Sequence, residues 1–324
     1  MSPEKALYHR FLDALRQRKG WDAATEDFFA PDAAIHIVHP WNALRGGGGY
    51  RTFLAELEQS LTGLHRRDHI AFSGMFEGGT WVTSTGYWAG RFIHPLRGIA
   101  PTGELAWLRV GEFHRIEGDR AVESYVFLDL PELMIAAGLW PIAEHPGATR
   151  GYTGMLPGPA TGDGMLWDTD APQRGAEAAE IVTKMLRGLN TPDQAWRPHW
   201  DTNMMWYGPA AFGSFIGVEA FGDFQVPFEA SFEGWSGGAA DNGLTAHFTR
   251  FGDGDYVCSG GWPSLTGVHV KPFLGCDPTS ERVFMRVCDW WRLEGPLCVE
   301  NWVFVDIPHV LLQLGRDVLA EASG

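Results

Sequence analysis

The sequence predicts an α+β protein in which one domain is repeated along the chain. The chain has 324 residues, more than the ~250–300 residues at which a single hydrophobic core stops growing. A long segment of the first half recurs in the second half, and in both halves helical patterns precede a series of strand-like patterns. Helices followed by consecutive strands are typical of helices packed on one face of an antiparallel sheet.

The internal repeat fixes the number of domains. Residues 123–129 (ESYVFLD) reappear 177 positions later as residues 300–306 (ENWVFVD). Further matches at the same offset, without a gap, join Gly90 to Gly267, Pro101-Thr102 to Pro278-Thr279, Arg109 to Arg286 and Arg115 to Arg292. Two copies are too few for a solenoid, so we expect two similar domains packed together.

The first copy opens with a predicted amphipathic helix, because apolar residues recur at helical spacing over residues 7–15. A second helix is predicted over residues 49–61, after a glycine run at 46–49 that we interpret as a turn. Strand-like stretches follow the helical patterns. They cover residues 34–38, 81–87, 106–116 and 121–129.

The second copy repeats this order, with a helical pattern over residues 181–189. Its strand-like stretches cover residues 203–207, 255–260, 282–293 and 298–306. Residues 141–173 between the copies are rich in Gly and Pro, which predicts an irregular linker. The predicted domains are therefore residues 1–140 and 174–324.

Composition excludes several classes of partner. Twenty-five Lys and Arg against forty Asp and Glu give a net charge of −15, so we expect no nucleic acid and no anionic membrane as partner. No stretch approaches the ~18–20 apolar residues of a membrane span, and the N-terminus is not signal-like, so we expect a cytoplasmic protein. The four cysteines are interpreted as buried thiols, and the fifteen tryptophans as core or as the lining of a cavity.

The last strand of each copy ends in an aspartate that shares its face with a glutamate and aromatic rings. Period-two alternation places Glu123, Tyr125, Phe127 and Asp129 on one face, and it places Glu300, Trp302, Phe304 and Asp306 on the matching face. A carboxyl group among rings would have a raised pKa, useful for proton transfer. Alternatively, each Asp caps the helix that follows it.

An arginine occupies the preceding strand of each copy, at Arg109 and Arg286, within an otherwise apolar face. A buried arginine is costly unless it is paired, so we expect the neighbouring Asp or Glu as its partner. Such a pair could hold the acid as a carboxylate base, or it could be purely structural.

Each copy resembles the SnoaL-like polyketide cyclases of the nuclear-transport-factor-2-like superfamily. The resemblance rests on Gly90-Arg91-Phe92, Pro101-Thr102-Gly103-Glu104, Arg109, residues 113–118 and residues 123–129, with the matching residues of the second copy. It implies two tandem cone-shaped domains, each a bent antiparallel sheet wrapped on N-terminal helices with a pocket in the open mouth. A histidine that family members often carry is replaced by Trp88 and Leu265.

By the same resemblance, Asp129 and Asp306 match the aspartate that removes a proton from a carbon next to a carbonyl. Arg109 and Arg286 would orient it or bind an oxyanion, and His36 could take the place of the missing histidine. The residues expected to contact the substrate are Tyr125, Trp302, Trp290, Phe113, Trp88, Trp107 and His94. We expect no cofactor and no metal.

The function favoured by the sequence is a cofactor-independent cyclase, isomerase or lyase that acts on a small, largely apolar carbonyl compound. The alternatives are a non-catalytic ligand-binding or protein-interaction module on the same fold, or a hydrolase of the epoxide-hydrolase type. The expected partner is a small molecule. The two copies would pair as an intramolecular pseudo-dimer, with a further homodimer of the whole chain as the opposing alternative.

Overall fold

The computed structural model describes residues 1–142, 155–169, 171–237 and 244–323. The chain forms two compact units. Unit 1 comprises Met1–Trp140, Pro157–Asp170 and Leu319–Gly324, and unit 2 comprises Pro141–Leu156 and Ala171–Val318. The predicted linker at 141–173 is thus divided between the units, and its residues 143–154 and 170 lie outside the described residues.

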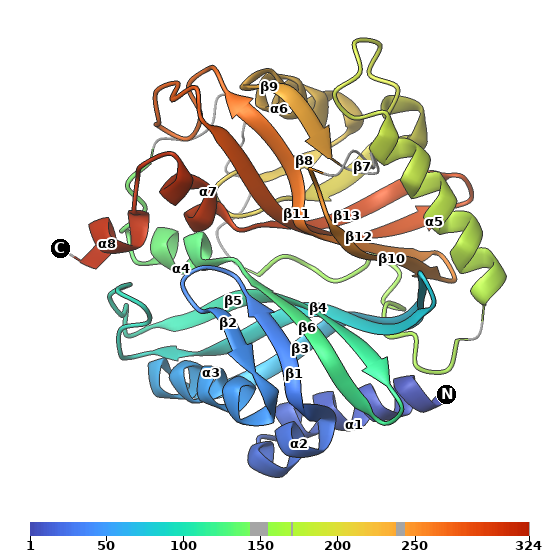
Figure 1. Cartoon of the computed structure of the whole chain (residues 1–324), viewed down its shortest axis with the longest axis vertical. Helices are drawn as coiled ribbons and strands as arrows, with labels where there is room; N and C mark the ends of the chain where they lie inside the picture. The colour runs from blue at the N-terminus through green and yellow to red at the C-terminus, as the bar shows by residue number, and fades with distance from the viewer. Residues whose placement is uncertain (143–154, 170, 238–243, 324) are drawn as a thin grey trace. The chain divides into compact units, whose positions relative to one another are not determined.

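Unit 1 is an α+β unit in which a six-stranded sheet is covered by three helices (Figure 1). The strand order is β2-β1-β6-β5-β4-β3, with β1 parallel to β6 and all other pairs antiparallel. Its elements are α1 (Pro3–Gln17), α2 (Trp21–Phe28), β1 (Phe29–Ile37), β2 (Asn42–Arg45), α3 (Gly46–Ser60), β3 (Leu61–Phe76), β4 (Gly79–Phe92), β5 (Leu105–Glu117), β6 (Arg120–Leu128) and α4 (Leu130–Ala136).

Unit 2 contains a seven-stranded sheet. Its elements are α5 (Pro172–Arg187), η1 (Arg197–His199), β7 (Trp200–Tyr207), β8 (Ser214–Ile216), α6 (Val218–Ala230), β9 (Phe232–Gly237), β10 (His247–Asp253), β11 (Tyr256–His269), β12 (Arg282–Glu294), β13 (Leu297–Val305) and α7 (Ile307–Gln313). A last helix, α8 (Val318–Ser323), groups with unit 1 from Leu319 onward.

The two sheets have the same topology, which fits the predicted tandem duplication. In unit 2 the order is β10-β11-β12-β13-β7-β8, and β7 runs parallel to β13 as β1 does to β6. β9 and β10 both pair with β11, so together they replace the single long strand β3. The predicted α+β class with two similar domains is confirmed.

Hydrogen bonds from the helices show which side of the unit 1 sheet they cover. Tyr50 on α3 donates to Glu112 on β5, and Tyr8 on α1 bonds Ser84 on β4. Glu112 and alternate residues along β5 therefore lie on the helix-facing side, whereas Arg109 and Phe113 lie on the opposite side. We call the latter the reverse side, and we use the same two terms for unit 2.

The glycine run at 46–49 is the first turn of α3, so its interpretation as a turn before the helix was wrong. The run permits close packing. A Cβ atom at Gly47 would lie 2.5 Å from Thr25 O on α2. Gly48, in contrast, is exposed and has no atom within 4 Å of the position of a Cβ.

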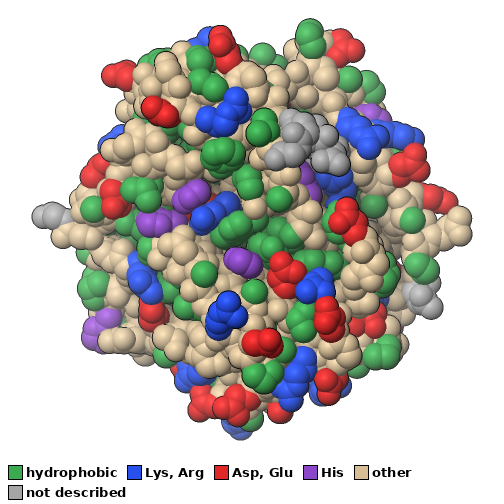
Figure 2. Space-filling view, viewed as in Figure 1, with side chains coloured by type: hydrophobic (Ala, Val, Ile, Leu, Met, Phe, Trp, Pro, Cys, Tyr) green, Lys and Arg blue, Asp and Glu red, His purple; other side chains and the backbone are tan. Residues whose placement is uncertain are grey.

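On the face of the molecule shown in Figure 2, Lys and Arg side chains are interspersed with Asp and Glu side chains. Among the described helices, none combines the length and the apolar character that a membrane span requires.

Two glycine substitutions should change stability in opposite directions. A Cβ atom at buried Gly86 on β4 would lie 1.9 Å from Arg67 O on β3, so Gly86→Ala should lower the free energy of unfolding by about 3 kcal/mol. Gly48→Ala should raise it by about 0.5–1 kcal/mol, because alanine favours the helix and meets no neighbour. Urea unfolding followed by circular dichroism measures both. Equal effects of the two changes would contradict the strand packing described above.

Candidate active site

The predicted pairing of each arginine with a neighbouring acid is found in both units, on the reverse side of each sheet, and the partner is an aspartate. Arg109 Nη1 donates to Asp129 Oδ2 over 3.4 Å, and Arg286 Nη1 donates to Asp306 Oδ2 over 3.0 Å. Both carboxylates are buried. Each arginine thus compensates a buried negative charge.

The helix-capping alternative holds for Asp306, whose Oδ1 accepts from His309 N at 3.3 Å in the first turn of α7. Within the described range, Asp129 makes no such bond to the first turn of α4. There, Glu132 Oε2 accepts from Arg109 N at 2.8 Å. The two predicted acids therefore have different surroundings.

A glutamate on the reverse side accepts one bond from arginine and one from tyrosine in each unit. Glu123 accepts from Arg115 Nε at 3.0 Å and from the Tyr125 hydroxyl at 2.8 Å. Glu300 accepts from Arg292 Nε at 2.5 Å and from a tyrosine hydroxyl at 3.3 Å. Both copies thus share this arginine–glutamate–tyrosine arrangement in addition to the strand order.

The tyrosine of unit 2 is Tyr207, which comes from a different strand. The ring of His36 on β1 stacks on Tyr125 at 4.7 Å, and the ring of Tyr207 on β7 stacks on Trp302 at 5.2 Å. Because His36 pairs with Tyr125 and Tyr207 pairs with Trp302 in the strand register, Tyr207 is the counterpart of His36. Unit 2 thus has a tyrosine where unit 1 has a histidine.

The remaining predicted contact residues do not form one site. Phe113, Trp107 and Trp290 lie on the reverse side. Trp88 lies on the helix-facing side, where its ring meets Trp21 of α2 at 6.0 Å. His94 is exposed after β4. The structure thus brings neither Trp88 nor His94 to the predicted acids.

A set of polar side chains that the sequence analysis missed lies on the helix-facing side of unit 1. Arg66 Nε donates to Asp68 Oδ1 over 2.8 Å, and its Nη2 donates to Glu112 Oε2 over 3.2 Å and to Ser84 Oγ over 3.1 Å. Tyr50 donates to Glu112 Oε1 over 2.6 Å. The side chains of Arg66 and Glu112 are fully buried.

His114 completes this set. Its Nδ1 lies 2.8 Å from Ser124 Oγ, and its Nε2 lies 3.7 Å from Glu112 Oε2. Tyr8 shares a hydrogen bond of 2.7 Å with Ser84 Oγ. We call the set the unit 1 cluster; its members are Tyr8, Tyr50, Arg66, Asp68, Ser84, Trp88, Glu112 and His114.

Charges inside the unit 1 cluster fix its protonation. Burial alone would raise the pKa of Glu112, but Arg66, His114 and Tyr50 hold it at about 2. Burial lowers the pKa of His114 despite the nearby Glu112 carboxylate. Burial also raises the pKa of Asp68 more than Arg66 lowers it. At neutral pH Glu112 is therefore a carboxylate and His114 a neutral imidazole.

Three polar atoms of the unit 1 cluster have no hydrogen-bond partner among the described residues. They are Arg66 Nη1, Trp88 Nε1 and His114 Nε2. Trp88 is also close to the charge, because the Arg66 guanidinium lies 5.0 Å from the centre of its ring. Buried donors without partners call for an explanation, such as a bound ligand or water.

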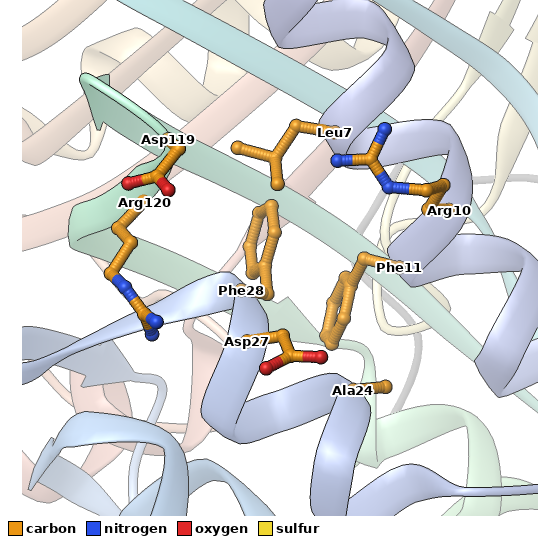
Figure 3. Close-up of a pocket in the computed structure, with 8 residues that line it drawn as sticks. All are labelled: Leu7, Arg10, Phe11, Ala24, Asp27, Phe28, Asp119 and Arg120. Atoms are coloured by element: carbon orange, nitrogen blue, oxygen red, sulfur yellow. The ribbon is translucent and has the colours of Figure 1, made fainter.

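A pocket of about 450 Å³ opens between α1, α2 and the β5–β6 turn of unit 1 (Figure 3). Phe11 and Phe28 line it and stack with ring centres 4.2 Å apart. On their other side the two rings contact His114, at 6.3 and 5.0 Å. These two rings therefore stand between the pocket and the unit 1 cluster. The other lining residues are Leu7, Arg10, Ala24, Asp27, Asp119 and Arg120.

Unit 2 carries a different polar set at the corresponding position. Arg250 on β10 pairs with Ser259 on β11, which in turn pairs with Asp289 on β12. Arg250 Nε donates to Ser259 Oγ over 3.4 Å. We call these three residues the unit 2 row. Ser259 and Asp289 hold the register positions of Ser84 and Glu112.

The unit 2 row lies on the helix-facing side. Gly252, two residues from Arg250 along β10, packs so closely on α5 that a Cβ at Gly175 would lie 2.3 Å from Gly252 O. Arg250 and Asp289 are nevertheless partly exposed. When the apolar residues of α1 and α5 are aligned, Val182 of α5 corresponds to Tyr8 of α1. The side chain at this position is therefore smaller in unit 2.

Burial raises the pKa of Asp289 to about 7, although Asn301 and Arg250 act in the opposite direction. Burial and, to a lesser extent, Arg187 lower the pKa of Arg250 to about 10. Asp289 thus exchanges its proton near neutral pH beside a side chain that is still cationic. Such a pair of groups is typical of functional sites.

Comparison with known proteins identifies the fold family of the first copy. The model of the SnoaL-like domain matches residues 8–124. Residues 8–124 form a SnoaL-like domain. None of the curated proteins matches the sequence significantly. The match supports an enzymatic or ligand-binding role at the level of the SnoaL-like family.

Solved structures similar to this chain each align with less than half of it. AclR, a candidate hydroxylase from Streptomyces galilaeus, has a TM-score of 0.36 and 18% identity, covering 43% of this chain and 96% of AclR. IdmH, a candidate polyketide cyclase from Streptomyces antibioticus, has a TM-score of 0.36 and 17% identity, covering 43% and 99%. A protein with a ketosteroid isomerase-like fold from Catenulispora acidiphila has a TM-score of 0.34 and 16% identity, covering 43% and 95%.

A sequence signal for the helix-facing acids was present. Glu112 and Asp289 are both acids at equal positions of the repeat, 177 residues apart, and most of the other residues on that side of the two strands are apolar. The candidate residues predicted from the repeat lay mostly at reverse-side positions, and the alternate positions carry the helix-facing acids.

Asp289 should make the stability of the protein depend on pH. The folded state keeps the Asp289 proton up to about pH 7, whereas the unfolded chain releases it near pH 4. The free energy of unfolding should therefore fall by about 3 kcal/mol as the pH rises from 4 to 7, and this part should level off above about pH 8. Asp289→Asn should remove it, as measured by urea unfolding at each pH. The exposed Asp277→Asn serves as control; parallel profiles for wild type and Asp289→Asn would contradict the raised pKa.

Proposed function

We propose that the chain is a cofactor-independent acid–base enzyme for a small, largely apolar carbonyl compound, and that its reaction takes place at the unit 2 row. The placement of Asp289 and Arg250 carries this proposal. Both lie on the helix-facing side, and yet both are partly exposed. Arg250 lies on β10 at the edge of the sheet, and Asp289 lies two strands further in, so a ligand can approach the pair from that edge. A few polar groups beside apolar side chains are typical of a ligand site.

The unit 2 row can perform proton transfer next to a carbonyl group. Asp289, as a carboxylate, takes the proton from the carbon beside the carbonyl, and the electron pair of that C–H bond moves toward the carbonyl oxygen. Arg250 donates a hydrogen bond to the enolate oxygen and stabilises its charge. Trp291, on the same side of β12, adds a buried Nε1 that has no partner among the described residues. Return of the proton to another carbon gives an isomerase, and attack of the enolate on a second carbonyl gives a cyclase.

The surroundings of the other acids support this choice. Glu112 holds the equivalent position in unit 1, but Arg66 and Tyr50 bind it and its side chain is fully buried. Asp129 and Asp306, the acids proposed from the sequence, lie buried beside arginines on the reverse side. They remain the alternative site of the reaction.

The test measures solvent deuterium exchange, which requires no knowledge of the natural product. The protein is incubated in D2O with a panel of apolar ketones such as 1-indanone and 2-tetralone, and mass spectrometry follows deuterium at the carbon next to the carbonyl. Asp289→Asn should lower the exchange rate at least ~100-fold, because a positioned base contributes 10²–10⁴-fold. The wild-type rate should rise with pH through about 7 as Asp289 loses its proton.

Three further variants assign the site. Asp277→Asn, at an exposed acid of the same unit, should keep the wild-type rate. Arg250→Met should lower the rate while Asp289 is retained. Loss of exchange in Asp129→Asn or Asp306→Asn, with full activity in Asp289→Asn, would move the reaction to the reverse side. Tight binding of a ketone without exchange in the wild type would favour the non-catalytic ligand-binding alternative.

A further inference from the structure

The pocket of Figure 3 is lined by two arginines and two aspartates in addition to apolar side chains. Arg10 comes from α1 and Asp27 from α2, whereas Asp119 and Arg120 lie at the β5–β6 turn. In Figure 3, Asp119 and Arg120 lie on one side of the Phe28 ring and Arg10 lies on the other. Charges of both signs, from separate elements, thus border one pocket of about 450 Å³.

These charged groups do not pair with one another. Within the part of the chain that the structure describes, the side chains of Arg10, Asp27 and Asp119 form neither an ion pair nor a hydrogen bond. Arg120 donates to the carbonyl oxygens of Glu26 and Phe29 and forms no ion pair there. Opposite charges that face one pocket without meeting leave both signs available to a ligand between them.

The second copy has a smaller pocket of about 270 Å³ at the equivalent place, between α5 and the β12–β13 turn. In the alignment of α5 with α1, Lys184 corresponds to Arg10. Lys184 pairs with Glu180, one helical turn away, over 2.8 Å. The repeat places Pro296 at the position of Asp119. The cation of unit 2 is therefore compensated within its own helix and meets no acid from the turn, whereas unit 1 presents separated charges.

A ligand that carries both a carboxylate and an ammonium group fits the pocket of unit 1. A simple anion would meet the two aspartates, and a simple cation would meet the two arginines, so each gains less than a zwitterion. Arg10 can bind a carboxylate through two parallel hydrogen bonds. Leu7 and Phe28 add apolar surface for a small side chain. The volume of about 450 Å³ lies in the range of small-molecule sites.

We propose that unit 1 binds a free α-amino acid with an apolar side chain in this pocket. The ligand's carboxylate accepts hydrogen bonds from Arg10, its ammonium group donates to Asp119, and its side chain contacts Leu7 and Phe28. Asp27 adds negative charge on the ammonium side. All of these residues belong to unit 1, so the proposal does not depend on the proton transfer assigned to unit 2.

The test is a ligand-observed NMR titration of the full chain with L-alanine, L-valine, L-leucine, L-methionine and L-phenylalanine. Two analogues of L-leucine separate the charges: 4-methylpentanoate lacks the ammonium group, and 3-methylbutylamine lacks the carboxylate. L-leucine should bind saturably, and each analogue should bind about tenfold more weakly, because each loses one charged hydrogen-bond partner.

Two variants assign the charges to their residues. Arg10→Met should weaken L-leucine about tenfold and leave 3-methylbutylamine unchanged, whereas Asp119→Asn should weaken L-leucine and leave 4-methylpentanoate unchanged. Arg16→Met is the control, because Arg16 lies on the same helix, pairs with Asp13 and does not line the pocket; it should bind L-leucine like the wild type.

Three results would overturn the proposal. They are the absence of saturable binding by every amino acid of the panel, equal affinities of L-leucine and its two analogues, and wild-type affinity for L-leucine in Arg10→Met.

Discussion

The structure depends on how each sheet accommodates a carboxyl group on its helix-covered side. A buried carboxylate must recover its lost hydration from a cation or hydrogen bonds, or else keep its proton. Unit 1 uses the first solution, since Arg66 and Tyr50 hold Glu112 ionised. Unit 2 uses the second, since Asp289 keeps its proton to about pH 7. The equivalent acids Glu112 and Asp289 thus differ in protonation at mildly acidic pH.

The divergence follows from a few side chains around that position. Arg66 reaches Ser84 from the strand position opposite Trp88, whereas Arg250 stands directly opposite Ser259. The tyrosine of α1 that bonds Ser84 is replaced by Val182 in α5. Loss of the hydroxyl removes a hydrogen bond that the serine could form. Duplication permits such a change because the other copy keeps the closed cluster.

The reverse sides changed far less. Both units retain an arginine–aspartate pair near the end of the last strand and a glutamate that accepts from arginine and tyrosine. Even where the tyrosine moved from β6 to β7, its hydroxyl still bonds the glutamate. A buried carboxylate is destabilising without its arginine, so each unit must keep both members of the ion pair. The residues that the sequence makes conspicuous are thus those that the fold needs in both copies.

The sequence by itself determined the duplication, the α+β class and the set of residues that share each side of a strand, because alternation and repeat spacing are local properties of the chain. It also predicted an Asp or Glu of the neighbouring strand as the partner of Arg109, because the two strands follow each other in the sequence. Only the tertiary structure decided which side the helices cover, since alternation gives two sides and does not distinguish them. The contact of Arg66 with Glu112, 46 residues apart, likewise depends on strand order and register. For this reason the helix-facing acids became candidates only once helices and sheet were packed together.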